Sequence, residues 1–524
     1  MKTQRITSAL VALTAGLGLA ACGGNASGTP AGSVTSAVSG STGTSSSSSA
    51  PASGSVTSAE SALLSDNAAS HASAQDTTYD AAQAVSVTLA DGASTASGTA
   101  GVSIKDDLIT ISTPGTYVLK GTLTDGSVVV NSDTDGTVRL VLDGATITNS
   151  VGAAVNIQAA DQAVVVLADG TTNALTDGTG YDTSAQDAPN AALFSMADLT
   201  IGGSGSLTVT GNTNDGIASK DGLVIQGGTI QVTAVDDGVR GKDYLIVAGG
   251  SLDVSAADDG LKSDNESDDT VGYILISGGK TTVTAGDDGV HAEGDLAVTG
   301  GTVEVTKSTE ALEGANIVIE NGSISLTSSD DGLNATAGTS SGGGMGGGGM
   351  QDDGSQLLIS GGTIVVNAGG DGLDSNGRTT ISGGTTVVYG PTMNGNGSLD
   401  SNGGTTVTGG TVLAAGSSGM AEAPDSASTG GWVQLGFSST VSAGQTVSIA
   451  SGDQVLATFT AVKDYSNLVF TGAGITSGQS YDVWFGGALA ADQVATFSLG
   501  GSIDGATKVG SVTAGQGTGG MGGH

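Results

Sequence analysis

Short stretches in which apolar and polar residues alternate recur through the middle of the chain. Thr229–Val232, Ser251–Val254 and Thr302–Val305 each alternate, and each follows a pair of glycines. Alternation that is rich in β-branched residues and bounded by glycine turns is typical of half-buried strands. No stretch in this region has apolar residues at the i, i+3, i+4 spacing, so helical repeats are disfavoured.

A second pattern punctuates these stretches: an acidic pair or its remnant, a glycine and an aliphatic residue. Its copies are Asn214–Ile217, Asp236–Val239, Asp258–Leu261, Asp287–Val290, Thr309–Leu312, Asp330–Leu333, Gly370–Leu373 and Asn396–Leu399. The copies that begin at 309 and 396 are degenerate, because another residue replaces the turn glycine. The glycine advances from 216 to 238 to 260, which is 22 residues per step, and insertions at 264–270 and 338–354 lengthen two later steps. A fixed period of this kind is the signature of a repeat architecture.

A coil of about 22 residues cannot bury its own apolar face and becomes stable only when neighbouring coils stack on it. We therefore predict an all-β protein: a right-handed parallel β-helix with coils of this length, an N-terminal β cap and a small C-terminal all-β domain. A leucine-rich repeat would need a regular leucine framework and an asparagine ladder, and both are missing. The nonapeptide calcium β-roll has a different period.

The repeats set the boundaries of the other parts. Residues 207–415 are predicted to be the regular coils, preceded over 84–206 by the N-terminal cap and the first irregular coils. A linker of small and polar residues over 416–431 leads to the C-terminal β domain over 432–507. The glycine-rich tail over 508–524 is predicted to be disordered.

The N-terminus has the pattern of an export signal. Lys2 and Arg5 precede an apolar run, and Leu19-Ala20-Ala21-Cys22 resembles a bacterial lipobox. The resemblance implies a signal peptide over 1–21, cleavage before Cys22 and diacylglycerol on its sulfur. The mature protein would then be exported, lipid-anchored to the bacterial cell membrane and facing outward. The alternative is an ordinary signal in which Cys22 is incidental.

Residues 22–83 are rich in Gly, Ser, Ala and Thr. This composition predicts a flexible tether that lifts the repeats off a surface. His71 lies in it and is interpreted as a linker residue rather than a ligand.

Composition narrows the classes of protein that fit. Aromatic residues are 3% of the chain, charged residues 12%, and 91 of 524 residues are glycine, so a globular core of large side chains is excluded. A thin core of stacked Val, Ile, Leu and Ala is allowed. With 14 Lys and Arg against 51 Asp and Glu, the net charge is −37, which excludes nucleic acid as a partner. The single cysteine leaves no disulfide within the chain.

Stacking would place the acidic turns above one another. Carboxylates about 4.8 Å apart repel, and a hard divalent cation relieves the repulsion. We predict Ca²⁺ as the cofactor, and its candidate ligands are Asp215, Asp236, Asp237, Asp258, Asp259, Asp264, Asp268, Asp269, Asp287, Asp288, Glu293, Asp330 and Asp331. The best-formed site is expected among Asp237, Asp258, Asp259, Asp264, Asp287 and Asp288.

Turn chemistry alone is the alternative, because Asp-Gly is a common turn dipeptide and Asp caps turns without a metal. The doubled Asp favours a metal, since a turn needs one Asp. The position two residues after the glycine also changes along the repeats, from basic to acidic: Arg240, Lys262, His291, Glu313, Asn334 and Asp374.

Several phrases together resemble one family: Gly115–Leu119, Pro189–Ser195, Asp215–Asp221, Val239–Asp243, Leu261–Asp264, Leu456–Phe459 and Tyr481–Gly487. Over roughly residues 85–500 the chain is similar to bacterial calcium-binding parallel β-helix proteins of a carbohydrate-binding domain family, related in fold to pectate lyases. The resemblance implies calcium in the β-helix and binding of cellulose or acidic pectin-like chains, without established lyase activity. The chain departs from the family at Glu310, Ser398 and the Gly- and Met-rich insertion, so fewer cation ligands are expected near those coils.

The function we predict is a surface-anchored, calcium-dependent, non-catalytic polysaccharide-binding protein with extracellular polysaccharide as its partner. Calcium would bridge the acidic edge to uronic acids, which a protein of this charge would otherwise repel. The repeats hold few aromatic residues that could stack on sugars, namely Tyr244, Tyr273 and Tyr389.

Two alternatives stay open. A calcium-dependent, pectate-type polysaccharide lyase needs a base beside the metal, and Arg240, Lys242 and Lys262 stand near the proposed cluster. The same residues would also serve as counter-charges that relieve the acidic ladder. The second alternative is a structural adhesin or stalk that calcium only stiffens.

Overall fold

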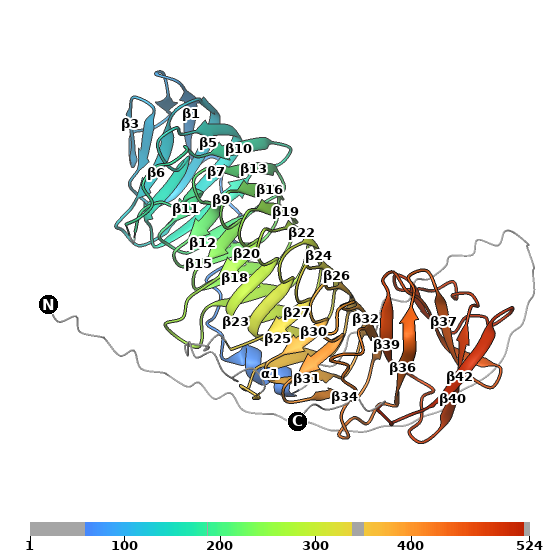
Figure 1. Cartoon of the computed structure of the whole chain (residues 1–524). Coiled ribbons are helices and arrows are strands. Elements are labelled where there is room, and N and C mark those ends of the chain that lie inside the picture. Colours follow the sequence, from blue (N-terminus) through green and yellow to red (C-terminus); the bar gives the residue numbers. More distant parts are fainter. Residues whose placement is uncertain (1–57, 186, 338–350, 518–524) are drawn as a thin grey trace, which may run out of the picture. The chain divides into compact units, whose positions relative to one another are not determined.

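The alternating stretches are strands that repeat with each coil in the computed structural model, which describes residues 58–185, 187–337 and 351–517 (Figure 1). One coil consists of β14 (Asp215–Ser219), β15 (Gly222–Ile225) and β16 (Thr229–Ala234), and the next of β17 (Val239–Gly241), β18 (Tyr244–Val247) and β19 (Ser251–Ala256). Each strand pairs in parallel with its equivalent in the next coil, for example Ile217 with Val239.

These pairings extend into three columns of parallel strands. The first column also contains β8 (Val155–Ala159), β11 (Ala191–Ser195), β20 (Leu261–Ser263), β23 (Val290–Val298), β25 (Leu312–Ile319), β27 (Leu333–Ala335), β30 (Leu373–Ser375) and β33 (Leu399–Ser401). The second contains β9 (Gln162–Leu167), β12 (Leu199–Gly203), β21 (Tyr273–Ile276), the second halves of β23 and β25, β28 (Gln356–Ile359), β31 (Arg378–Ile381) and β34 (Thr405–Val407). The third contains β10 (Thr172–Thr176), β13 (Ser206–Gly211), β22 (Lys280–Thr284), β24 (Thr302–Lys307), β26 (Ser323–Thr327), β29 (Thr363–Asn367), β32 (Thr385–Tyr389) and β35 (Thr411–Gly416).

The protein is thus nearly all-β, with one large and mostly parallel sheet, and its fold is β-helix-like. The parallel columns extend upstream of residue 207, into the segment where the sequence predicts the first irregular coils. There β6 (Ser127–Asn131) pairs in parallel with β8, and β7 (Thr137–Thr148) pairs in parallel with β9 and β10. The right-handed sense of the coil stays a prediction from the chirality of parallel connections.

The cap ahead of the columns mixes antiparallel and parallel pairs. Its strands are β1 (Val85–Ala90), β2 (Thr95–Ala96), β3 (Val102–Lys105), β4 (Leu108–Ile111), β5 (Gly115–Leu123), β6 (Ser127–Asn131) and β7 (Thr137–Thr148). The pairs β1–β2 and β3–β4 are antiparallel, whereas β1–β5, β4–β6 and β5–β7 are parallel.

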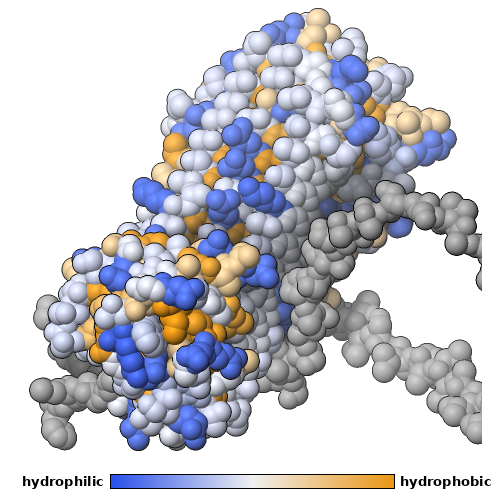
Figure 2. Space-filling view, turned by 90° about the vertical axis from the view of Figure 1, so that its right-hand side faces the viewer, coloured by the Kyte–Doolittle hydropathy of each residue, from blue (hydrophilic) through white to orange (hydrophobic). Residues whose placement is uncertain are grey.

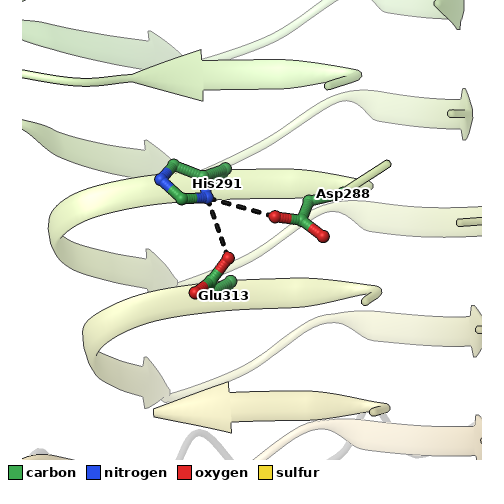
Figure 3. Close-up of side chains that lie close together, drawn as sticks. All are labelled: Asp288, His291 and Glu313. Atoms are coloured by element: carbon green, nitrogen blue, oxygen red, sulfur yellow. Dashed lines mark hydrogen bonds and ion pairs between the residues drawn. The ribbon is translucent and has the colours of Figure 1, made fainter. Parts of the chain in front are cut away.

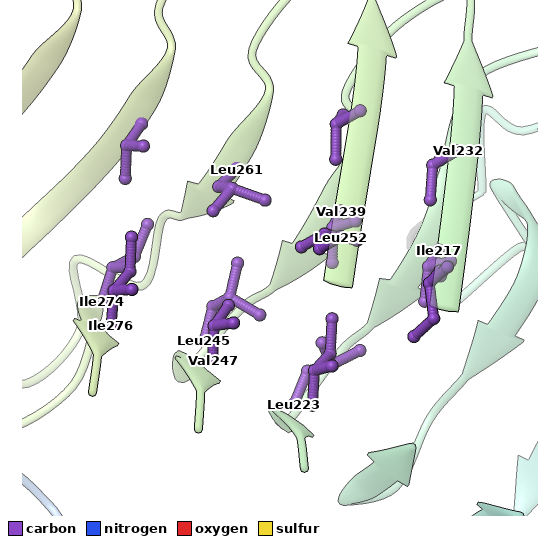
Figure 4. Close-up of a cluster of buried hydrophobic side chains, with 14 of the residues drawn as sticks. Ile217, Leu223, Val232, Val239, Leu245, Val247, Leu252, Leu261, Ile274 and Ile276 are labelled. Atoms are coloured by element: carbon purple, nitrogen blue, oxygen red, sulfur yellow. The ribbon is translucent and has the colours of Figure 1, made fainter. Parts of the chain in front are cut away.

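The core is a stack of aliphatic side chains that point inward from the three columns (Figure 4). Ile217, Val239 and Leu261 follow one another in the first column, and each is fully buried. Burial of this kind stabilises by about 25 cal/mol per Å² of apolar surface, which one coil gains only from its neighbours. Large side chains are not needed, which agrees with the low aromatic content.

The glycine of each acidic turn is required by this core. A Cβ at Gly238 would collide with Cγ1 of Val254, and the same valine position faces the glycine in five other coils. The two degenerate turns carry Ala311 and Ser398 in place of glycine. At the valine position their coils carry Leu326 and Ala414, which align with Val305 and Val388 of the preceding coils and are not branched at Cβ. The turn residue and the third-column residue are therefore matched in size.

Part of the predicted tether is folded, which corrects the sequence interpretation. Ser58–Ser65 is a short helix, α1, and Leu63 and Leu64 pack against the second column. Ala68 and Ala72 pack on Tyr244 and Tyr273. Small side chains permit this close packing as readily as they permit a linker, so composition alone could not distinguish the two. Among the described residues, no helix is long and apolar enough to cross a membrane.

The C-terminal part forms a second sheet on the end of the first. Its strands are β36 (Trp432–Val441), β37 (Thr446–Ser451), β38 (Gln454–Thr460), β39 (Tyr465–Thr471), β40 (Ser480–Phe485), β41 (Phe497–Leu499) and β42 (Thr507–Thr513). β39 pairs antiparallel with both β35 and β36, and the other five form a sheet in the order β41-β38-β37-β40-β42. The tail predicted to be disordered from 508 onward is therefore a strand over its first residues, while 518–524 lie outside the described residues.

Candidate functional site

Two rows of polar side chains run along the first column. The turn row contains the acidic residue before each turn glycine or its replacement: Asp215, Asp237, Asp259, Asp288, Glu310, Asp331 and Asp371. The strand row, in register from coil to coil, contains Arg240, Lys262, His291, Glu313, Asn334, Asp374 and Asp400. The residues whose character changes from basic to acidic along the sequence therefore lie in one row along the first column.

The turn row has a structural role that the sequence did not reveal. One carboxylate oxygen accepts a hydrogen bond from the backbone N–H of the equivalent residue in the next coil. The contacts are Asp259 N to Asp237 Oδ1 at 3.3 Å, Asp288 N to Asp259 Oδ1 at 3.0 Å, Glu310 N to Asp288 Oδ1 at 3.3 Å, and Asp371 N to Asp331 Oδ1 at 2.6 Å. The second Asp of the pair therefore satisfies the backbone between coils, so its presence does not require a metal.

In the early coils a basic side chain neutralises the turn row. Lys262 Nζ lies 3.3 Å from Asp237 Oδ1, 2.7 Å from Asp259 Oδ2 and 3.8 Å from Asp258 Oδ2. Burial lowers the pKa of Lys262, but the bonds to Asp259 and Asp237 outweigh burial and raise its pKa above the usual value. The ammonium group thus occupies the centre of the predicted best cation site.

Arg240 does the same one coil earlier. Its guanidinium pairs with Asp264 and lies 3.9 Å from Asp215 Oδ2. Asp264, expected as a calcium ligand, is therefore an anionic partner of an arginine. Asp215 itself is fully buried, and burial together with Asp237 raises its pKa well above the usual value.

His291 is the third cation in the strand row (Figure 3). Its Nδ1 lies 3.1 Å from Asp288 Oδ2 and 2.9 Å from Glu313 Oε2, and these three side chains could together hold a metal ion. Burial opposes the charged imidazole, but the hydrogen bonds to Asp288 and Glu313 outweigh it and raise the pKa of His291 to about 10. At neutral pH the imidazole is therefore positively charged, like Arg240 and Lys262.

From Glu310 onward in the turn row and from Asn334 onward in the strand row, no residue of either row is basic. In the described part of the chain, no ion pair with a basic side chain reaches Glu310, Asp331, Asp371, Asp374, Asp400 or Glu422. We call these six residues the uncompensated cluster. They come from consecutive coils, and Glu422, from the predicted linker, accepts a hydrogen bond from Ser401 N at 3.1 Å.

Burial and mutual repulsion hold protons on this cluster. Burial and the Asp331 carboxylate raise the pKa of Asp374 to about 8. Burial raises the pKa of Glu310 to about 8, although Asn334 donates to its carboxylate at 2.7 Å. Burial likewise raises the pKa of Asp331 to about 7 and of Glu422 to about 7. The side-chain amide nitrogen of Asn334 makes the bond to Glu310, while its side-chain oxygen is buried and has no hydrogen-bond donor, which leaves an oxygen ligand unused beside the cluster.

The remaining predicted ligands fall into two groups. Asp236, Asp237 and Asp258, and likewise Asp258, Asp259 and Asp287, bring carboxylate oxygens within 4.8 Å of one another. The others are dispersed: Asp268 bonds to Thr270 in its own loop, and Asp268, Asp269 and Glu293 line an open pocket. Asp330 is exposed at the edge of its turn. Of the uncompensated cluster, only Asp331 is among the ligands that the sequence predicts. Glu310 and Asp371 could not be assigned because their turns lack the full acidic pair, and Asp374 because it lies in the strand row. Asp400 follows a degenerate turn, and Glu422 lies outside the repeats.

The three basic residues considered for lyase chemistry are not alike. Arg240 and Lys262 are held in ion pairs, and Lys242 makes no ion pair within the described residues. The sequence interpretation did not single out Lys220, which lies 5.9 Å from the Phe194 ring centre. Burial and the nearby Arg240 lower the pKa of Lys220, whereas the ion pairs of Lys262 raise the pKa of that residue.

The tyrosines considered as sugar platforms are covered. Tyr244 and Tyr273 stack with ring centres 5.2 Å apart, and each side chain is 5% exposed. The backbone N–H of His71 donates to the Tyr244 hydroxyl at 2.8 Å, and Tyr273 donates to Ala68 O at 2.8 Å. His71 also bonds to Thr200 at 3.0 Å, so it fixes the N-terminal segment to the coils and is no mere linker residue. Tyr389 is buried below the C-terminal strands.

A known family matches the coils that carry the first part of these rows, whereas Asp371, Asp374, Asp400 and Glu422 lie beyond the matched segment. A family model described as "Carbohydrate-binding domain-containing protein" matches residues 105–354. A protein of the same description from Acetivibrio thermocellus is 41% identical over 136 residues, which are 26% of this chain and 48% of that protein. The chain therefore spans about half the length of this relative. The solved structure of a polysaccharide lyase-like protein from C. thermocellum, a gadolinium derivative, is 31% identical, with 45% of this chain and 96% of that chain covered and a TM-score of 0.40.

Proposed function

We propose that the protein binds polysaccharide outside the cell without cleaving it. The match of residues 105–354 to a carbohydrate-binding domain family carries this proposal. The repeated coils support it, because an extended stack of parallel strands offers a long surface to an extended chain.

Calcium is proposed as the cofactor, and the uncompensated cluster is its favoured location. All of its side chains offer oxygen, the ligand that calcium prefers, and the unused Asn334 oxygen adds a neutral one. In the early coils a cation would have to displace Lys262 or His291 from their carboxylates. Asp331, Asp371, Asp374 and Asp400 have no basic side chain that calcium would need to displace, and calcium would supply positive charge to an otherwise repulsive stack. Among the described residues, the groups of three side chains whose ligand atoms already lie within 4.8 Å of one another belong to the early coils, so calcium at the uncompensated cluster would draw its side chains together.

Attachment to the cell membrane through lipid on Cys22 is part of the proposal. Cys22 and the signal peptide over 1–21 lie outside the described residues. Mass spectrometry of the protein purified from its native membrane checks this part. Cleavage before Cys22 removes the preceding residues, and lipidation adds the mass of the acyl chains to the new N-terminal peptide.

A calcium-dependent lyase is the second candidate, and Lys220 is the observation that favours it. A base must be deprotonated at the working pH, and burial lowers the pKa of Lys220, whereas ion pairs keep Arg240 and Lys262 protonated. Appearance of ultraviolet-absorbing unsaturated product from pectate, lost in Lys220→Met, would establish the lyase in place of a binding protein.

Retention on glycans tests the main proposal. The full chain is run through native gels that contain soluble polysaccharides and is pulled down with cellulose, with calcium or with EDTA. Retention by at least one glycan supports polysaccharide binding, and loss of retention by acidic glycans in EDTA supports calcium dependence. The double variant Asp371→Asn/Asp374→Asn should lose the calcium effect, whereas Asp453→Asn, an exposed carboxylate on a C-terminal turn, should keep it. Absence of retention under every condition would leave the stalk as the better description.

A further inference from the structure

The C-terminal domain contains a pocket of about 560 Å³ that lies outside the segment matched by the carbohydrate-binding family. It forms where β36 departs from β39: the pairing of the two strands breaks between Gly436 and Val441. The intervening residues turn toward β40 and β42 of the other sheet. Figure 2 shows apolar residues gathered on this end of the molecule and surrounded by hydrophilic ones.

The floor of the pocket is aromatic. Phe437 and Phe485 are stacked with ring centres 5.9 Å apart and an interplanar angle of 24°. Both rings are partly exposed, unlike Tyr244, Tyr273 and Tyr389 of the coils. The apolar floor continues into Val509 of β42, whose side chain is 46% exposed. The aromatic surface that the repeats lack is therefore available here.

The rim of the pocket is polar and uncharged. Ser438, Ser439 and Thr440 are exposed along one side, and Gln445 lines another. No Asp, Glu, Lys or Arg is among the lining residues, although the chain carries a net charge of −37. Lys508, next to Val509, is held by Asp482 at 2.7 Å and does not serve the pocket as a free cation.

These features select the chemistry of the ligand. A pyranose ring has an apolar face that packs on an aromatic ring, and its hydroxyls bond to Ser, Thr and Gln side chains. A uronate would bring a carboxylate into a site without a cation. The pocket of about 640 Å³ beside His291 differs in this respect, because Glu266, Asp268, Asp269 and Glu293 line it and would repel a uronate.

We propose that the pocket on β36, β40 and β42 binds a neutral glycan chain, with Phe437 and Phe485 as the stacking surface. This inference rests on the proposed polysaccharide binding and adds where neutral chains are bound and which class is chosen. The C-terminal domain then provides calcium-independent binding next to the acidic coils.

Isothermal titration of the full chain in EDTA tests the proposal, with cellohexaose, xylohexaose and mannohexaose as neutral probes and hexagalacturonate as the acidic one. The expected result is binding of at least one neutral probe and none of the acidic one. Phe485→Ala should weaken it about tenfold, the effect of losing one aromatic contact of about 1.4 kcal/mol. Leu499→Ala, which removes an exposed apolar side chain at the opposite edge of the same sheet, should have no effect.

A rim variant guards against misfolding. Ser439→Glu adds a charge at an exposed position, so the melting temperature should stay unchanged while neutral-glycan binding falls at least as much as in Phe485→Ala. If the wild-type chain binds a neutral glycan and both variants bind it equally well, the pocket assignment is wrong while polysaccharide binding stands.

If hexagalacturonate is the only probe that binds, the pocket assignment is likewise wrong while polysaccharide binding stands. If no glycan binds with or without calcium, both proposals fail. If sedimentation velocity shows a dimer that Ser439→Glu abolishes, the pocket binds a second copy of the chain and the glycan assignment is overturned.

Discussion

At the scale of single residues, Lys262 decides how the early acidic turns are stabilised. It contacts three carboxylates from two coils and is 21% exposed, so solvent screens it only in part. A buried ion pair is weak evidence for stability, but removal of one partner leaves an uncompensated charge and costs about 3–5 kcal/mol. Removal of Lys262 should therefore cost more stability than the ion pairs contribute on balance.

Lys262→Met should lower the free energy of unfolding by about 2–4 kcal/mol in EDTA, because Asp237 and Asp259 lose their counter-charge. Urea denaturation followed by circular dichroism measures the loss. Lys280→Met is the matched control, since Lys280 is 55% exposed and pairs with exposed Glu304 at 3.5 Å, a kind of pair that contributes less than about 1 kcal/mol. Equal losses in the two variants would contradict the counter-charge role.

In the uncompensated cluster, removal of a charged side chain should stabilise the protein, in contrast to the loss expected for Lys262. Asp374→Asn keeps the size of the side chain and removes a carboxylate that is half-buried among others. In EDTA at pH 8 this variant should be more stable than the wild type by about 1–2 kcal/mol, because like charges no longer repel. With calcium the gain should shrink or reverse, since a ligand is lost. Thermal melts with calcium and with EDTA separate the two effects, and destabilisation in EDTA would argue against repulsion in the cluster.

The turn row and the strand row show most clearly which parts of the site could be predicted from the sequence. The strand row could be predicted, because a constant period puts Arg240, Lys262 and His291 in register. The role of Asp237 as acceptor for the next coil's backbone could not, since it depends on which way the carboxylate turns inside the stack. In the sequence the doubled Asp favours calcium, but this backbone bond accounts for the second Asp without a metal. Glu422 could not be assigned at all, because it belongs to no repeat.

At the scale of elements, strand positions and coil length follow from alternation and period. Ile217 and Val239 align as the period requires, and insertions are accommodated between strands without disturbing the columns. The folding of 58–83 onto the coils could not be predicted in the same way. Its contacts, such as that of His71 with Tyr244, join residues far apart in the sequence, and local composition carries no record of them.

The match in size between the turn residue and the third-column residue predicts that substitutions at the two positions are coupled. Gly238→Ala should cost about 1–3 kcal/mol, because the new methyl group collides with Val254. Val254→Ala also costs stability, by creating a cavity. The double variant should lose less than the sum of the two, as the natural pair Ser398 and Ala414 implies. Urea denaturation of the four proteins measures the coupling, and strict additivity would show that the two positions are independent.

At the scale of the whole molecule, the raised pKa values set a pH dependence. The pKa of Glu310 and of Asp374 is about 8 in the folded state, above the unfolded values of 4.5 and 3.8. The folded protein then holds more protons than the unfolded one between these limits. Its stability from these groups is complete below about pH 4 and is lost as pH rises to about 8. His291, whose pKa is raised to about 10, acts in the same direction at higher pH.

In EDTA the melting temperature should therefore fall between pH 5 and pH 8. Calcium should restore it at pH 8 and have little effect at pH 5, because protonated carboxyl groups bind calcium poorly. Differential scanning calorimetry at several pH values measures the trend. Asp331→Asn/Asp374→Asn should flatten the profile, whereas Asp453→Asn should leave it as it is. A profile in EDTA that rises toward pH 8 would contradict the assignment of these groups.

The antiparallel pairing of β39 with β35 has a consequence for self-assembly. Every other strand of the third column offers its free edge to the next coil, and a stack ending in an open parallel edge is a template for further chains. β39 closes that edge with a strand of opposite direction, on which another coil cannot continue the column. The N-terminal end of the stack is closed by the antiparallel pairs β1–β2 and β3–β4, so a chain shortened to end at Gly416 exposes one open end. It should therefore associate in pairs through that end, which light scattering and sedimentation velocity would reveal, while the full chain stays dispersed.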